Sequence, residues 1–561
     1  MTTLQVDRQN SFARGMRDSA APTEYAPDEV ETLLNGRPSR VGNSIEPRGG
    51  SKRTHAAEIN DGEDGLGAIE YRAANRTQHF VVVVGNTWYH STDQGETWTA
   101  IAGATNYQPH PWSLVLMRVG AENRVIGANG GVATKPVSWN GDGAVTTLDN
   151  WPNGIRHLAV FNDRLFGSDG TITVLGSKVS DPSTLDTEDG GLSIQCQAHD
   201  DDPEITGLWT HGVVLLVFKR RSMGYIEGFG FNTISVQTGD RGLSRSVGCI
   251  AHRSIAPAGD GGVCWLSDRG VEYLPPGGLS PQLVSQPIQA FMDTIDYAGI
   301  ASNPGLPCAL WWQRREEYWL AVPSGSATEN THIICFRPGN ANRPHAVWLF
   351  QSALVTGGTF EIDADGILQY RDDTTANRVR LINGVLELDP LTGTFVEIDE
   401  DGILQLASIG AGAGALFVAD RGTAHERPHM VGYDGFVREL ETGGMDDVLS
   451  DGSEGSAIEA KVRSRPFIYG DPLRNKRPVS VRLSALPESP TANVSVRLLG
   501  DGEQLSQRTV QIVRRASTRP RPTRARMGGK KASAIQVEVN FHGHVTLQAV
   551  EAVVRLLDEV P

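Results

Sequence analysis

The chain has 561 residues, and its 51 Lys and Arg against 66 Asp and Glu leave a net charge of −15. An acidic balance of this size excludes a protein that binds nucleic acid over its whole surface. Hydrophobic residues at 39% and charged residues at 21% are ordinary for a globular protein, and the length allows a sizeable core.

Cysteine usage argues against a disulfide framework. The number is odd and no pair has C-x-x-C spacing, while several cysteines lie in apolar runs: Cys196, Cys249, Cys264, Cys308 and Cys335. Buried free thiols are expected, with no zinc site and no cofactor. The first eight residues contain no apolar segment of the signal-peptide type, which predicts synthesis in a reducing cytoplasm.

Residues 1–60 are rich in Gly, Pro, Arg and Ser and lack the periodicity of strands or helices. The exception is the stretch from Pro27 to Leu34, where Pro and acids in the first turn favour a short helix. We interpret this region as an extended arm that becomes ordered by docking on another molecule. A disordered tail is the alternative.

From residue 65 to residue 442 the sequence has the rhythm of consecutive antiparallel hairpins. The clearest stretch runs from Ile205 to Leu274, where short β-branched and aromatic runs alternate with Gly, Asp and Ser turns. The last of these strands is expected to end near Leu440. An all-β fold with a β-propeller of six to eight blades is the prediction.

One hairpin has a specific signature, S-x-D-x-G-x-T-W. It resembles the Asp-box of sialidases and other propellers. The aspartate is expected to accept N–H groups of the turn, the glycine to take a positive φ, and the tryptophan to pack on the blade. Its residues are Ser91, Asp93, Gly95, Thr97 and Trp98.

A nine-residue segment is duplicated within the predicted propeller. The stretch from Glu361 to Gln369 recurs from Glu397 to Gln405, so residues 361–405 are expected to contain a duplicated hairpin unit. Its D-x-D-G turn could accommodate calcium, but the remaining ligands of a calcium loop are absent. A plain Asp-Gly turn is the preferred interpretation.

After a polar linker, residues 457–561 are expected to form a separate β-sandwich. Within it lies a basic segment without acids, interpreted as a loop that contacts either DNA or an acidic partner. We place it at a protein interface, away from any DNA channel. Its residues are Arg514, Arg515, Arg519, Arg521, Arg524, Arg526, Lys530 and Lys531.

No combination of residues predicts catalysis. The cluster from His199 to Asp202 is followed by Pro203 and indicates a loop. His425 and His429 flank a proline that prevents a helix from aligning them, and His542 and His544 have no nearby acid or cysteine. The nearest match to the sialidase F/Y-R-I-P motif is Phe336-Arg337-Pro338, and we predict that the chain is not an enzyme.

A set of loose motifs, weak one by one, carries a resemblance through its order along the chain. The motifs of the arm lie around Phe12, Met16, Asn35 and Arg48, and those of the hairpins at residues 176–183, 202–208, 218–228, 248–249 and 266–273. In this order they resemble the tail nozzle or hub (tail tubular) proteins of tailed bacteriophages.

The resemblance implies a structural virion protein of the tail, made in the host bacterial cytoplasm. Such a protein forms a ring, hexameric in this interpretation, around the DNA exit channel below the portal and adaptor. Its partners are copies of itself and other tail proteins, with transient contact to genomic DNA and no membrane-spanning segment. The lumen is expected to be neutral or acidic, because phosphate contacts would slow the DNA. A glycan-cleaving propeller enzyme and a receptor-binding spike are the alternatives.

Overall fold

The computed structural model describes most of the chain. The described residues are 4–197, 204–228, 233–238, 242–259, 261–278, 280–325, 327, 329–340, 344–351, 359–362, 368–371, 376–382, 385–389, 394–398, 404–408, 412–420, 426–442, 458–469, 474–514, 522–527, 529–542 and 545–556. Almost all of its regular structure is β-strand, which confirms the all-β prediction. None of the helices in these ranges is long and apolar enough to cross a membrane.

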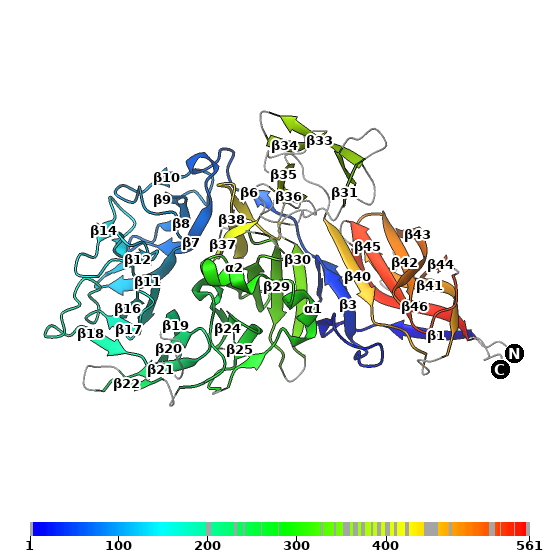
Figure 1. The fold of residues 1–561 in the computed structure, drawn as a ribbon, viewed down its shortest axis with the longest axis horizontal. Helices are drawn as coiled ribbons and strands as arrows, with labels where there is room; N and C mark the ends of the chain where they lie inside the picture. The colour runs from blue at the N-terminus through cyan, green and yellow to red at the C-terminus, as the bar shows by residue number, and fades with distance from the viewer. Residues whose placement is uncertain are drawn as a thin grey trace.

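Seven four-stranded antiparallel blades form a propeller (Figure 1). The first four follow the chain directly, each from its innermost to its outermost strand. They are β7 (Gly65–Arg72), β8 (Gln78–Val84), β9 (Thr87–Ser91) and β10 (Thr99–Ala100); β11 (Ser113–Val119), β12 (Glu122–Ala128), β13 (Val137–Trp139) and β14 (Thr146–Thr147); β15 (His157–Phe161), β16 (Arg164–Ser168), β17 (Thr173–Gly176) and β18 (Leu192–Gln195); and β19 (Ile205–His211), β20 (Val214–Lys219), β21 (Met223–Glu227) and β22 (Ser235–Gln237).

The remaining three blades close the ring. Blade 5 contains β23 (Ala256–Ala258), β24 (Gly262–Ser267), β25 (Gly270–Leu274) and β26 (Gln282–Leu283); blade 6 contains β27 (Cys308–Trp312), β28 (Glu317–Val322), β29 (His332–Arg337) and β30 (Ala346–Gln351); and blade 7 contains β37 (Ala413–Ala419), β38 (Arg427–Gly432), β39 (Val437–Glu439) and β6 (Lys52–Arg53). Strand β37 lies beside both β27 and β7, so blade 7 completes the circle. Seven blades agree with the predicted six to eight.

Within the described ranges, five short helical segments connect strands of the propeller. They are η1 (Asn60–Gly62), η3 (His252–Ser254), η4 (Gln286–Ile288), α1 (Gln289–Met292) and α2 (Tyr297–Ser302).

The internal repeat forms two hairpins of identical register. Between blades 6 and 7, the chain makes a six-stranded antiparallel sheet of β31 (Thr359–Ile362), β32 (Leu368–Arg371), β33 (Ala376–Ile382), β34 (Val385–Asp389), β35 (Thr394–Ile398) and β36 (Leu404–Ser408). Glu361 pairs with Gln369 in the first copy as Glu397 pairs with Gln405 in the second. The duplicated hairpin is therefore confirmed, while the Asp-Gly turns lie outside the described residues.

The C-terminal region is a two-sheet sandwich, as predicted, but it is not separate from the propeller, because one of its sheets continues through β3 and β2 of the N-terminal arm into blade 6. Its strands are β40 (Glu459–Ser464), β41 (Lys476–Pro487), β42 (Thr491–Gly500), β43 (Glu503–Val513), β44 (Thr523–Arg526), β45 (Ile535–His542) and β46 (Val545–Leu556). One sheet has the order β40-β45-β42-β43, and the other contains β46-β41-β44. Along β46 the core residues alternate with Glu551, Val553 and Arg555, which lie on the outer face.

The N-terminal arm pairs with the propeller and with the sandwich of its own chain. It contains β1 (Leu4–Gln9), β2 (Gly15–Met16), β3 (Glu29–Leu34), β4 (Gly36–Pro38) and β5 (Ile45–Pro47), followed by β6. Strand β1 pairs with β46, β2 and β3 lie between β30 and β40, and β6 is the outermost strand of blade 7. Blade 6 and half of the sandwich therefore share one ten-stranded sheet.

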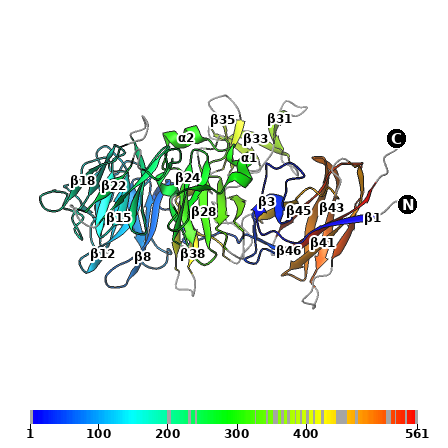
Figure 2. The ribbon, with the colours of Figure 1, turned by 90° about the horizontal axis from the view of Figure 1, so that it is seen from below.

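One expectation about the arm is wrong. The helix expected from Pro27 to Leu34 is strand β3, because parallel pairing with β2 and antiparallel pairing with β40 override the local helix signal. The strands of the arm find hydrogen-bonding partners within their own chain, and docking of the arm on another molecule stays a prediction. In both views the arm runs between the propeller and the sandwich (Figures 1 and 2).

The arm requires a glycine where it crosses blade 6. Gly15 has φ +72°, and a Cβ atom there would collide with the carbonyl oxygen of Val347 in β30. We expect Gly15→Ala to lower the free energy of unfolding by about 3 kcal/mol, through backbone strain and the collision together. Chemical denaturation measures the loss.

Gly120→Ala is the matched control. Gly120 has φ +60°, but no atom lies within 4 Å of a Cβ placed there, so only the left-handed backbone is penalised. A loss of about 1 kcal/mol is expected. Equal losses in the two variants would show that the contact between β2 and β30 is not tight.

Candidate functional site

The arm residues singled out in the sequence are buried where propeller and sandwich meet. Phe12 and Met16 belong to the hydrophobic core that blades 5 and 6 share with the sandwich. Asn35, at φ +53°, donates its backbone N–H to the Leu349 carbonyl at 2.9 Å and its amide to the Glu459 carbonyl at 3.1 Å. Arg48 donates through Nε to Oδ1 of Asn35 at 3.0 Å. Asn35 and Arg48 thus join blade 6 to β40.

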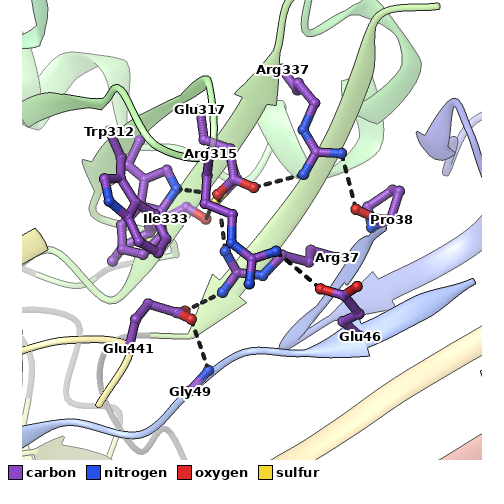
Figure 3. Close-up of polar contacts among 12 residues, drawn as sticks. Arg37, Pro38, Glu46, Gly49, Trp312, Arg315, Glu317, Ile333, Arg337 and Glu441 are labelled. Carbon is purple, nitrogen blue, oxygen red and sulfur yellow. Dashed lines mark hydrogen bonds and ion pairs between the residues drawn. The ribbon is translucent and has the colours of Figure 1, made fainter. Parts of the chain in front are cut away.

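A buried charge network fixes the arm on blade 6 (Figure 3). The Glu317 carboxylate accepts from Arg37 Nη1 at 3.0 Å and from Arg337 Nη2 at 2.7 Å. Arg37 also pairs with Glu441, which accepts the backbone N–H of Gly49 at 3.1 Å. These contacts hold together residues of β4, β28 and β29 and the segment after β39.

The network is electrically balanced, with two arginines and two glutamates. Glu317 is 0% exposed, and Arg37 and Arg337 are 0% and 1% exposed. Burial opposes the charge of Arg37, yet Glu441 and Glu317 outweigh it and raise its pKa. Burial alone would raise the pKa of Glu317, but Arg37 and Arg337 outweigh burial, and the net result is a lowered pKa. Arg37 and Glu317 therefore keep their charges in this buried position because oppositely charged side chains lie beside them.

Sequence reasoning missed most of this network. In the sequence Arg337 stands out only as part of a weak match to a sialidase motif, whereas in the structure its guanidinium binds Glu317 and the carbonyl of Pro38. One signal was available: Glu317 begins the strand Glu-Tyr-Trp-Leu-Ala-Val, in which every residue is buried. An acid at the start of such a strand requires a buried cation.

The innermost strands of the propeller enclose an apolar cavity of about 380 Å³. Its wall includes Ile69, Leu114, Val160 and Trp209, and the side chain of Leu116 is 46% exposed there. This volume lies at the lower end of small-ligand pockets. The centre of one propeller is therefore far too narrow for duplex DNA.

A second cavity of about 630 Å³ forms the polar mouth of this channel, and the two share Ser113, His252 and Arg253. The guanidinium of Arg253 donates to the carbonyls of Gly305 at 2.7 Å and Gly414 at 2.6 Å. It connects backbone segments of blades 6 and 7. This arrangement indicates a structural role for Arg253.

Ser113 and His252 are in contact but do not form a nucleophile–base pair. His252 Nε2 lies 3.0 Å from Ser113 Oγ, and its Nδ1 accepts the N–H of Leu208 at 3.5 Å. The proton of the neutral ring is therefore assigned to Nε2, which cannot then accept a proton from the serine. Burial and Arg253 lower the pKa of His252 to about 4, so the ring stays neutral at pH 7.

Two other titratable groups at the mouth are held in their neutral forms. Burial raises the pKa of the Tyr433 phenol, which remains protonated and a weak nucleophile. Burial and His252 lower the pKa of His157 well below its usual value. In the ranges that the structure describes, no three His, Cys, Asp or Glu side chains gather to hold a metal ion.

The Asp-box forms the predicted turn. Asp93 Oδ1 accepts from Ser91 Oγ at 2.6 Å and from the Thr97 N–H at 2.9 Å, and Gly95 has φ +90°. Trp98 packs against the core between blades 1 and 7, with its ring 6.0 Å from that of His55 in the arm. The motif stabilises the junction at which the propeller closes.

The basic segment is partly a strand and only partly a loop. Arg524 and Arg526 lie in β44 at the edge of the sandwich, and Arg514, Lys530 and Lys531 are also exposed. Arg515, Arg519 and Arg521 lie outside the described residues. The placement of this segment at a protein interface stays a prediction.

The remaining sequence candidates form no site among the described residues. The cluster at 199–202, His425 and His544 lie outside them. His429 is buried, with Nδ1 3.0 Å from the Arg427 carbonyl, and stacks on Phe417 at 5.1 Å. All five cysteines are buried free thiols, as predicted.

Comparisons with known proteins find structural similarity alone. No family model and no curated protein matches the chain. Solved structures that match include the computationally designed Ika8 protein, with 11% identity, TM-score 0.33 and coverage of 69% of this chain and 99% of that one. They also include the Neurospora crassa Pan2 WD40 domain, with 9% identity, TM-score 0.32 and coverage of 58% and 92%. BamB from Moraxella catarrhalis has 9% identity, TM-score 0.27 and coverage of 59% and 94%. At these scores the strand pairing itself remains the basis for the propeller assignment.

Removing the shared carboxylate should break the buried network. Glu317→Gln removes the buried negative charge that Arg37 and Arg337 both contact, so we expect a loss of about 3–5 kcal/mol in the free energy of unfolding. Urea denaturation measures it. The neighbouring Glu316→Gln is the control, because Glu316 is exposed and pairs with exposed Arg40 at 3.7 Å. A change of less than about 1 kcal/mol is expected there, and similar losses in both variants would contradict the network.

The Asp-box makes a pH-dependent contribution. Burial alone would raise the pKa of Asp93, but hydrogen bonds from Ser91 and Thr97 lower it to about 2. We expect Asp93→Asn to cost about 1 kcal/mol at neutral pH. The contribution of the carboxylate is complete above its unfolded value near 4 and disappears as pH falls through about 2.

The measurement is the difference in unfolding free energy between wild type and Asp93→Asn as a function of pH. It should narrow between pH 4 and pH 2. Glu96→Gln in the same turn, where Glu96 is exposed, should show no such difference. A gap between wild type and Asp93→Asn that stays constant through this range would contradict the assigned role of the carboxylate.

Proposed function

We propose that this chain is a non-enzymatic structural component of a bacteriophage tail, of the hub, nozzle or tube type. Several copies would form a ring around the DNA exit channel below the portal and adaptor, retain the genome and then conduct it. The observation that carries the proposal is the order of the nozzle-like motifs along the whole chain, from the arm around Phe12 to the C-terminal domain.

The architecture supports a role in transmitting force. Blade 6 continues through β2 and β3 into β40, β45, β42 and β43, so one continuous sheet joins the propeller to the sandwich. A shared hydrophobic core and the network around Glu317 reinforce the connection. A tail component must transmit force between its neighbours, which favours a connection of this kind over a flexible linker.

The channel dimensions support a ring of copies. The apolar cavity of about 380 Å³ within the propeller cannot hold duplex DNA. A DNA conduit built from this chain must therefore lie between subunits. The chemistry of the mouth supports a role without catalysis, because Ser113, His252 and Arg253 are engaged in contacts within the propeller.

The test is the position of the chain in purified particles. An epitope added within the sandwich, at the exposed turn around Gly502, should be labelled by antibody along the tail axis in electron micrographs. Particles made without the chain should lose packaged DNA. Its absence from purified particles, or multiple turnover of a glycan substrate by the isolated chain, would refute the proposal.

A further inference from the structure

The outer face of one sandwich sheet carries arginines in three neighbouring rows. In this sheet β1 pairs with β46, β46 with β41, and β41 with β44, so residues in register lie on the same face. The registers place Arg8, Glu551, Arg482 and Arg524 in one row. The second row contains Val6, Val553, Ser480 and Arg526, and the third contains Leu4, Arg555 and Arg477.

We call the six arginines of these rows the arginine face. It consists of Arg8, Arg477, Arg482, Arg524, Arg526 and Arg555. Only one acid shares these rows: Glu551 lies 3.3 Å from Arg8 and 3.6 Å from Arg482. Six positive charges and one negative charge leave an excess of five, in a chain whose net charge is −15.

The described residues of the chain compensate the charges on this face only partly. Arg477 stands directly opposite Arg555, although like charges in register destabilise a sheet. Among the described residues, Arg477, Arg524, Arg526 and Arg555 have no carboxylate within 4 Å. On the same face, Leu4 is 55% exposed and Val6 is 51% exposed. An external partner that is acidic and partly apolar would satisfy both features.

The opposite end of the molecule offers the complementary charge. Residues 179–218 contain eight acids and no lysine or arginine. Asp186, Glu188 and Asp189, which we call the acidic rim, are exposed in the segment between β17 and β18 of blade 3. Both views place β18 at one end of the long axis and β1 and β41 near the other, and Figure 1 shows β44 beside β41 (Figures 1 and 2).

We propose that the arginine face of one copy docks on the acidic rim of the next copy of this chain. The contact rests on the proposed function for its place in the tail, and it assigns the surfaces through which the ring forms. Because the two surfaces lie at opposite ends, the association is head-to-tail, and it closes into a ring when the rotation between copies allows.

The composition of the face favours a protein partner over DNA. A phosphate backbone is bound by cations and offers nothing to Leu4 and Val6. Protein interfaces, in contrast, are enriched in arginine and combine it with apolar side chains. Arginine also binds carboxylates through two parallel hydrogen bonds, which gives the contact orientation as well as charge.

Charge reversal at both ends tests the contact. Arg524→Glu/Arg526→Glu reverses the face, and Glu188→Lys/Asp189→Lys reverses the rim while leaving the Asp186 carboxylate, which accepts the Glu188 N–H at 2.9 Å, in place. Mass photometry and light scattering of the purified full-length chain should show wild-type oligomers. Each double variant should weaken self-association by roughly tenfold or more, since attractive pairs become repulsive.

Restoring complementarity should restore assembly. The two double variants mixed together should form alternating oligomers, and a chain carrying all four substitutions should assemble alone. Arg72→Glu/Arg118→Glu, at exposed positions of blades 1 and 2, changes the net charge by the same amount and sign as Arg524→Glu/Arg526→Glu and should assemble as the wild type does. Thermal unfolding of every variant establishes that each one folds.

Several outcomes would overturn the contact. They are a wild type that stays monomeric at all concentrations, double variants that assemble normally, or reversed pairs that fail to rescue one another. Binding of a fluorescent DNA duplex that the face variant alone abolishes, with self-association unchanged, would assign the face to DNA. Particles that contain the chain in their tails while the contact fails would leave the proposed function standing.

Discussion

The architecture depends on one buried carboxylate whose ion-pair network connects three segments of the chain. Glu317 lies between the guanidiniums of Arg37 and Arg337, and Arg37 in turn contacts Glu441. These residues come from the arm, from blade 6 and from the end of the propeller. Because an unpaired buried charge is costly, the native position of each segment is favoured only when the others are present. The network therefore specifies the path of the arm as well as stabilising it.

Most of the propeller could be predicted from the sequence, because its hairpins and turns are formed by residues that lie close together along the chain. The hairpins between Ile205 and Leu274 have clear turns and apolar strands, and the structure contains them as β19, β20, β21, β24 and β25. The Asp-box needs only side chains within seven residues of one another, from Ser91 to Thr97. The repeated hairpin has the same register in both copies because residues 361–369 and 397–405 differ at a single position, Ala364 against Glu400.

The arm was misread because its structure is determined by distant residues. Its strands β2, β4 and β6 have two or three residues each, too few for an alternation pattern. In β3 the residues Glu29 to Leu34 favour a helix locally, but long-range pairing decides their conformation. The partners of β1 lie more than 500 positions away along the chain, at residues 550–555. In the basic segment, the alternation of Arg524, Ala525 and Arg526 did carry a strand signal.

The pairing of β6 with β39 has a consequence for how the chain folds. Blade 7 needs both residues 52–53 and residues 437–439, so the circle cannot close until nearly the whole propeller has been synthesised. Until then β6 lacks its partner strand β39. Strand β1 remains unpaired for longer, because its partner β46 lies at residues 545–556. Contacts of such long sequence separation slow folding and leave intermediates open to aggregation. We therefore expect the nascent arm to require protection, by chaperones or by fast engagement with blade 6, before the ring is complete.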